Sequence, residues 1–78
     1  MNKARRKRLA EAAELLEQAL SIISETRDEE QEAFDALPES FQGGERGQAM
    51  EEAISSMEDV HGAVENARDT LADIAGGA

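Results

Sequence analysis

Several residue types that carry chemistry or membrane insertion are missing from this sequence. Its 78 residues include no cysteine, no tryptophan and no tyrosine. The lack of cysteine excludes disulfide bonds, iron–sulfur clusters and thiolate zinc sites, and it suits a reducing compartment. No apolar run is long enough to cross a bilayer, and an amphipathic pattern rather than a signal-peptide core follows the charged start. We therefore expect a cytoplasmic protein with no membrane partner.

Catalytic and metal-binding patterns are also scarce. His61 is the only histidine, and no serine or threonine has a base and an orienting partner at a suitable spacing. Glu58 and His61 have the spacing of a di-iron motif, but the expected apolar row passes through Met57 and Val60, so Glu58 is expected to point outward. We predict no catalytic residue, no metal site and no cofactor, and hence no enzyme.

Helix-breaking residues gather in one stretch, residues 37–50, between two strongly helical patterns. Pro38 is the only proline; it lacks an N–H and disfavours the helical conformation at Leu37. Gly43 and Gly44 allow a sharp turn, and Gly44 is suited to cap the next helix. We expect Phe41 to fold back over the helix ends.

These signals predict an all-α antiparallel helical hairpin over residues 9–75. The expected elements are a helix of about residues 4–37, a bend at 38–44 and a second helix of about 45–75, with a frayed tail at 76–78. Gly62 lies in the middle of the second helix, where glycine costs about 1 kcal/mol relative to alanine, and the close approach of another group is one reason to find it there.

The charge is unevenly distributed along the chain. The formal net charge is −10; five of the eight basic residues lie within residues 1–8, and all eighteen acidic residues lie from Glu11 onward. We interpret residues 1–8 as a basic N-terminal arm, either the frayed start of the first helix or a surface for an acidic partner. Because the acidic body repels phosphates, direct binding of nucleic acid is not expected.

The apolar residues form more rows than one hairpin needs. The first helix has a row of apolar residues with alternating spacings of three and four, and a second apolar row lies beside it, shifted by one residue. Arg27 and Glu30 continue the first row, three residues apart, a spacing at which their side chains can pair. The first row is Leu9, Ala13, Leu16, Leu20 and Ile23, the second is Ala12, Leu15, Ala19 and Ile22, and the row of the second helix is Met50, Ala53, Met57, Val60, Val64, Ala67, Leu71 and Ile74.

Two rows on one helix predict two neighbours. We therefore expect the hairpin to form a homodimer, a four-helix bundle with two-fold symmetry. The alternative is a monomeric hairpin that docks on a host partner.

Acidic residues also form a row on the second helix. Glu51, Glu58 and Glu65 are spaced by seven residues, which places them about 10.5 Å apart along a helix. Such a row either keeps the protein soluble or imitates the phosphates of DNA and occupies the groove of a DNA-binding protein.

The segments Asp35-Ala36-Leu37-Pro38-Glu39-Ser40-Phe41-Gln42, Glu45-Arg46-Gly47 and Met50-Glu51-Glu52-Ala53-Ile54 resemble small uncharacterised acidic proteins that bacteriophages and integrated mobile elements encode. The resemblance implies a genomic setting and carries no assigned activity. Relatives of this kind often have a serine where this chain has Gly44.

The resemblance and the lack of catalytic groups together favour a non-catalytic protein-binding module. Its expected role is to inhibit or modulate a protein of the bacterial host, including antiviral defence proteins, through Phe41, Gln42 and Arg46. Three alternatives stay open: a DNA mimic acting through Glu51, Glu58 and Glu65, a structural or assembly component of a phage particle, and a sponge for a small anionic ligand held by Arg27, Arg46 or the basic arm.

Overall fold

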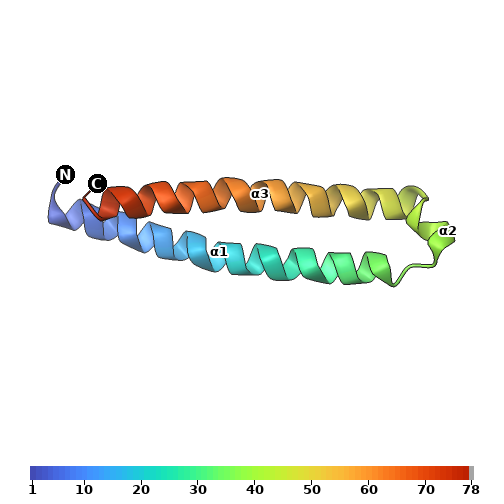
Figure 1. Cartoon of the computed structure of the whole chain (residues 1–78). Coiled ribbons are helices and arrows are strands. Elements are labelled where there is room, and N and C mark those ends of the chain that lie inside the picture. The colour runs from blue at the N-terminus through green and yellow to red at the C-terminus, as the bar shows by residue number, and fades with distance from the viewer. Residues whose placement is uncertain (78) are drawn as a thin grey trace.

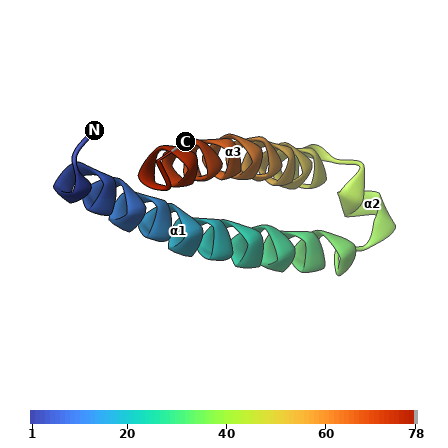
Figure 2. The same cartoon turned by 60° about the vertical axis from the view of Figure 1, so that its left-hand side comes forward.

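The chain is a long, narrow helical hairpin. A computed structural model describes residues 1–77, which form α1 (Lys3–Asp35), a short α2 (Glu39–Gln42) and α3 (Glu45–Ala75). α1 and α3 run antiparallel side by side over a molecule with extents of 58 × 14 × 13 Å (Figure 1). The view in Figure 2 shows the same arrangement, with α2 joining the helices at one end, the bend end, and both chain ends at the other, the open end. The expected all-α fold and its helix pair are confirmed.

The first helix begins within one residue of the expected start, at Lys3. Asn2 is its N-cap, and the Asn2 side chain accepts a hydrogen bond of 2.9 Å from the backbone N–H of Arg5. Asparagine is among the strongest N-cap residues because its side-chain oxygen satisfies a free N–H of the first turn. From Lys3 onward, the residues of the expected basic arm therefore lie in the first turns of α1. Their role as a surface for an acidic partner stays a prediction.

The bend is built around Gln42 and not around Phe41. Residues 39–42 form the single turn α2, and Gln42 Nε2 donates hydrogen bonds to the carbonyl oxygens of Phe34 (3.3 Å) and Leu37 (3.1 Å) at the end of α1. Phe41 is 56% exposed. The expectation that Phe41 folds over the helix ends is wrong, because the amide of Gln42 satisfies the last carbonyls of α1 and takes that place.

Gly47 is the glycine that the bend requires. A Cβ atom on Gly47 would lie 2.0 Å from the carbonyl oxygen of Gln42, so the backbones of α2 and α3 approach too closely for any side chain. A Cβ atom on Gly62 would meet nothing within 4 Å. The close approach expected at Gly62 is therefore absent, and the bend has one at Gly47 instead.

The ends of α3 are set by glycines on both sides. Gly44 is the N-cap, with an extended backbone, and its carbonyl oxygen accepts the N–H of Gln48 at 2.9 Å. At the other end Gly76 and Gly77 close the last turn onto the carbonyl oxygens of Ala72 and Ile74. Gly77 has a φ of 85°, which only glycine adopts readily. Of the tail expected at 76–78, Ala78 lies outside the described residues.

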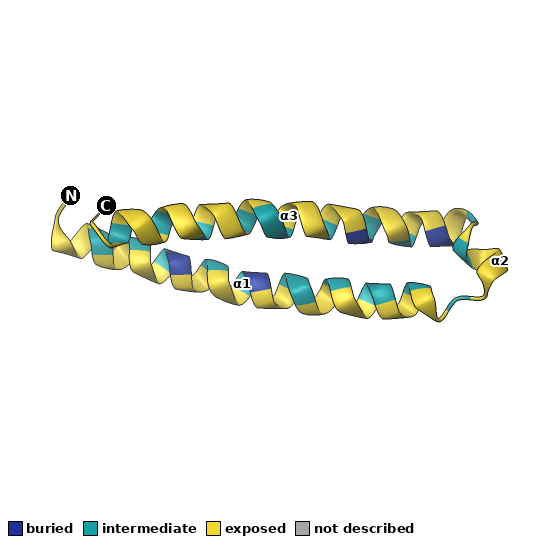
Figure 3. Cartoon of the chain, viewed as in Figure 1, coloured by how far each residue is buried: buried dark blue, intermediate teal, exposed yellow. Residues whose placement is uncertain are grey.

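The hydrophobic core between the two long helices is thin. Among residues 1–77 the buried apolar side chains are Ala13 and Leu20 of α1 and Ile54 of α3, and Figure 3 shows the exposed class covering most of both helices. A core this small gives a single hairpin little hydrophobic stabilisation.

The row of α3 that faces α1 differs from the expected one in alternate positions. Val60, Ala67 and Ile74 were expected in this row but are exposed. The apolar surface of α3 is wider than one partner helix covers. α1 packs against the side of this surface that borders the polar residues His61 and Arg68. The buried and half-buried positions of α3 are Gly47, Met50, Ala53, Ile54, Met57, His61, Gly62, Val64, Arg68, Leu71 and Ala75.

Candidate functional site

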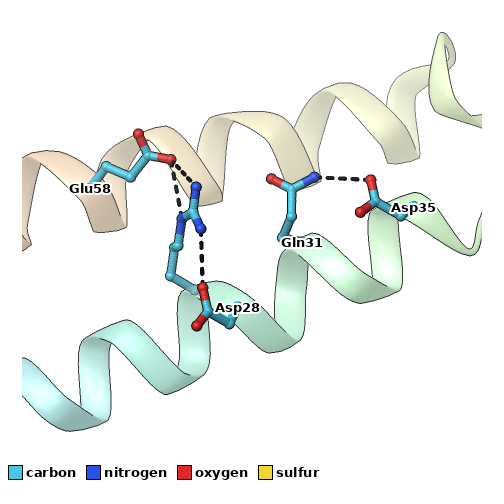
Figure 4. A network of polar contacts seen from close by, with 5 residues as sticks. Asp28, Gln31, Asp35 and Glu58 are labelled. Carbon is cyan, nitrogen blue, oxygen red and sulfur yellow. Dashed lines mark hydrogen bonds and ion pairs between the residues drawn. The ribbon is translucent and has the colours of Figure 1, made fainter.

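Two ion pairs connect α1 and α3 along one side of the hairpin. In the first, Arg27 donates from Nε and Nη2 to Glu58 Oε1, at 3.2 and 2.9 Å, and from Nη1 to Asp28 Oδ1 at 3.0 Å (Figure 4). Glu58 is exposed, as expected, and its carboxylate also reaches across the hairpin to Arg27. Arg27 pairs with Asp28 and Glu58 rather than with Glu30, because the antiparallel helix offers a carboxylate at the same level.

The second ion pair repeats this arrangement with the helices exchanged. Arg68 of α3 donates to Glu17 of α1 and also to Asp69 Oδ1, at 3.0 Å from Nε and 2.9 Å from Nη2. The two pairs are ten residues apart on α1 and ten residues apart on α3, as straight antiparallel helices require. A slip of one helix along the other breaks both pairs at once, so together they favour one register.

The carboxylates raise the pKa of both arginines. Hydrogen bonds to Glu58, then to Asp28, raise the pKa of Arg27 above its ordinary value, and bonds to Glu17, then to Asp69, raise the pKa of Arg68 in the same way. A raised pKa in the folded state stabilises the fold below the ordinary arginine pKa, and the contribution is lost only as the pH rises through the raised value. Because arginine is charged throughout the physiological range in any case, the pairs introduce no pH switch there.

The ion pairs border a shallow groove that we call the polar face. Its lining includes Ser24 and His61 between the two arginines. Within residues 1–77, no group of three or more His, Asp or Glu side chains is placed to hold a metal ion. The polar face comprises Glu17, Ser21, Ser24, Glu25, Arg27, Asp28, Glu58, His61, Glu65 and Arg68.

The opposite side of the hairpin exposes large apolar side chains. Ile22 and Val60 line one shallow groove, and they are 63% and 50% exposed. Leu15 lies seven residues before Ile22 and Ile74 lies fourteen after Val60, so each shares the face of its neighbour; they are 64% and 36% exposed. We call Leu15, Ile22, Val60 and Ile74, with the alanines between them, the apolar face. It consists of the second row of α1 and the uncovered half of the row of α3.

The bend end brings together three of the residues singled out in the sequence. Phe41 and Arg46 are exposed there, while the Gln42 side chain is occupied by the carbonyl oxygens of α1. Gln42 thus holds α2 in place, and its contact with a partner stays a prediction. The other three residues lie along α3: Glu51 lines a hollow beside Phe34 and Ile54, Glu58 pairs with Arg27, and Glu65 lines the polar face near Arg68.

The candidate residues of a ligand sponge lie apart within one chain. Arg27 is near the middle of the polar face, Arg46 is at the bend end, and the basic segment 1–8 is at the open end, where the guanidinium of Arg6 lies beside Gly77. Arg27 is moreover held by two carboxylates.

Sequence reasoning missed Arg68, Glu17 and Gly47. The first two could have been found from the sequence. If the two helices are paired antiparallel about a midpoint between Gln42 and Gly43, Glu17 lies opposite Arg68 and Arg27 lies opposite Glu58. Gly47 gave no such signal, since a glycine in the first turn of a helix does not reveal what approaches it.

No protein-family model, no curated protein and no solved structure matches the chain. None of the helices within residues 1–77 combines the length and the apolar character needed to span a membrane.

Proposed function

We propose that the protein is a non-catalytic protein-binding module that inhibits or modulates a protein of a bacterial host, in the manner of small phage-encoded proteins. The observation that carries this proposal is the exposure of Phe41, 56% of which faces solvent at the tip of the rod. Exposed aromatic side chains on a fixed framework are frequent anchors of protein interfaces.

The framework beneath Phe41 is fixed on both sides. The two hydrogen bonds of Gln42 hold α2 to the end of α1, and the contact at Gly47 packs it against α3. A side chain presented on such a framework loses little conformational freedom on binding. Arg46, exposed in the first turn of α3, supplies a polar contact at the edge of the same surface.

The chemistry of the bend half also indicates the kind of partner. Residues 22–62 contain twelve acidic residues and two arginines. A partner that recognises this end would offer an apolar pocket for Phe41 within a basic rim, since opposite charges across an interface speed association and fix orientation.

Alanine substitution at the bend tests the proposal. Tagged wild-type protein, Phe41→Ala and Arg46→Ala are incubated with host lysate at low and high salt, with Gln48→Ala as the control at an exposed position of α3. We expect one host protein to remain bound at high salt to the wild type and to Gln48→Ala, and to be lost from Phe41→Ala. Equal retention by all variants would contradict the assignment of the bend.

We also propose that the working form is a homodimer, a four-helix bundle. The support is the imbalance between a thin core and the four large side chains of the apolar face that a single hairpin leaves in water. A second hairpin would bury them, as two-layer helical bundles do.

A DNA mimic is a second candidate, favoured by the acidity of the bend half. All three glutamates of the expected row are exposed, and Glu58 is paired with Arg27. A mimic would capture nucleic-acid-binding proteins that wash off as salt screens the charges. Retention of the captured protein at high salt would contradict the DNA mimic and support the bend as the binding surface.

The remaining two alternatives stay predictions. A structural or assembly component of a phage particle would co-purify with virions. A ligand sponge would need Arg46 or the basic segment 1–8 to meet basic residues of another chain, because these groups lie apart in one hairpin.

A further inference from the structure

The hairpin is amphipathic as a whole, and this determines which side a second copy covers. On the polar face each cross-hairpin ion pair already satisfies its arginine, so burying that face would remove paired charges from water. On the apolar face Leu15, Ile22 and Val60 are all at least half exposed. Covering them releases apolar surface from water at no electrostatic cost.

The area of one face suits a second hairpin. The rod is 58 Å long and 14 Å wide, so one side projects about 800 Å². Stable interfaces bury roughly 800 Å² per partner. Two hairpins packed along their full length therefore match a standard interface, whereas a crossed arrangement would use only part of the face.

The charge distribution selects between the two full-length orientations. Ile22 and Val60 lie level with each other near the middle of α1 and α3. The bend half, residues 22–62, carries twelve acidic and two basic residues, and the open half, residues 1–21 and 63–77, carries six of each. The whole net charge thus lies in the bend half. Hairpins with both bends at one end would bring two such halves side by side, at about the interaxial distance of packed helices, 8–10 Å. At this distance, which is close to the screening length, like charges still repel each other.

The geometry points to an antiparallel homodimer in which the apolar faces of two hairpins pack together about a two-fold axis near Ile22 and Val60, with each bend beside the partner's open end. This inference rests on the homodimer proposed above. In this arrangement the basic segment 1–8 of each chain lies along the acidic bend half of the other. Opposite charges then flank an apolar centre.

The choice of face is tested by two neighbouring residues. Ile22 belongs to the apolar face and Ser21 to the polar face, and both are exposed in one hairpin. We expect Ile22→Glu to convert the dimer to a monomer in analytical ultracentrifugation, and Ser21→Glu to remain dimeric. A dimer that survives Ile22→Glu, or one that Ser21→Glu dissociates, would overturn the assignment of the face.

The orientation is tested by energy transfer in undisrupted dimers. Because the chain has no cysteine, a single introduced cysteine is the only site for a thiol-reactive dye. Gly43→Cys places a dye at the bend, where a new Cβ meets nothing within 4 Å, and Asp73→Cys places one at an exposed position near the open end. With a dye pair of short range, we expect strong transfer between a Gly43→Cys chain and an Asp73→Cys chain, and little between two Gly43→Cys chains.

The outcomes separate this inference from the homodimer itself. Strong transfer between two Gly43→Cys chains would show a dimer with both bends at one end, which overturns the inference and leaves the homodimer standing. A monomeric wild-type protein would overturn both. As a further check, Lys3→Glu combined with Lys7→Glu should weaken the dimer at low salt and have little effect at high salt. An unchanged affinity at low salt would contradict the role of the basic segment.

Discussion

At the scale of single residues, two glycines with the same helix propensity have opposite roles. Gly47 lies where a Cβ atom would overlap the backbone of Gln42, and Gly62 faces open space. Neither has the positive φ that would strain another residue. The difference comes entirely from what surrounds each position, which the sequence pattern does not reveal.

Substitution by alanine should therefore act in opposite directions at these positions. Gly47→Ala should destabilise the hairpin by at least about 2 kcal/mol, because the overlap forces the bend apart. Gly62→Ala should stabilise it by about 0.5–1 kcal/mol through helix propensity. Urea unfolding followed by circular dichroism measures both, and a stabilising Gly47→Ala would show that the bend is not packed as described.

Gln42 should behave as a structural residue. Gln42→Ala removes the hydrogen bonds to the carbonyl oxygens of Phe34, which keeps the N–H of Leu37, and of Leu37. The loss should cost about 1 kcal/mol, whereas Gln48→Ala at an exposed position should cost much less. Urea midpoints of the two variants, compared at equal chain concentration, measure the difference. If Gln42→Ala is as stable as Gln48→Ala, the amide does not hold the bend.

At the scale of the elements, the bounds of the helices could be predicted from the sequence, but the residues through which α1 and α3 contact each other could be predicted only in part. Pro38, Gly44 and the terminal glycines act locally, so α1 and α3 fall within two residues of the ranges expected from the sequence. The contact row of α3 was less certain, because Met57 and Val64 belong to two overlapping rows. The sequence pattern favours the row with Val60, and the hairpin uses the row with His61.

At the bend, too, the sequence did not predict which side chain is packed inward. Phe41 and Gln42 are neighbours in one turn of α2, and residue type favoured burying Phe41. The structure instead places the polar side chain inward, because the end of α1 offers carbonyl oxygens that need donors. The packing of the candidate site therefore depended on contacts that only the folded hairpin brings together.

The ion pairs between α1 and α3 should be coupled and sensitive to salt. Arg27→Gln and Glu58→Gln should each lower stability at low salt, and the double variant should lose less than the sum of the two because both remove one interaction. Arg46→Gln, whose side chain is exposed at the bend end, is the control. Thermal melts at low and high ionic strength should show the coupling shrink as salt screens the pair. A coupling that is absent at low salt would mean that the pair does not hold the register.

At the scale of the whole molecule, stability should depend on concentration. If two hairpins bury their apolar faces together, the melting temperature rises with chain concentration by mass action. We expect this rise for the wild type and for Ser21→Glu, and a constant melting temperature for Ile22→Glu. Calorimetry over a hundredfold range of concentration measures it. A wild-type melting temperature independent of concentration would contradict the four-helix bundle.

Both chain ends lie at the open end, and this has a mechanical consequence. A force that pulls the two ends apart separates α3 from α1 one turn at a time, starting beside Arg6 and Gly77, instead of shearing all contacts together. The hairpin should therefore unzip at low force, with resistance first where Arg68 meets Glu17 and again ten residues further on, where Arg27 meets Glu58. The bend at Gly47 and Gln42 would be the last part to open and the first to form again when the force is released.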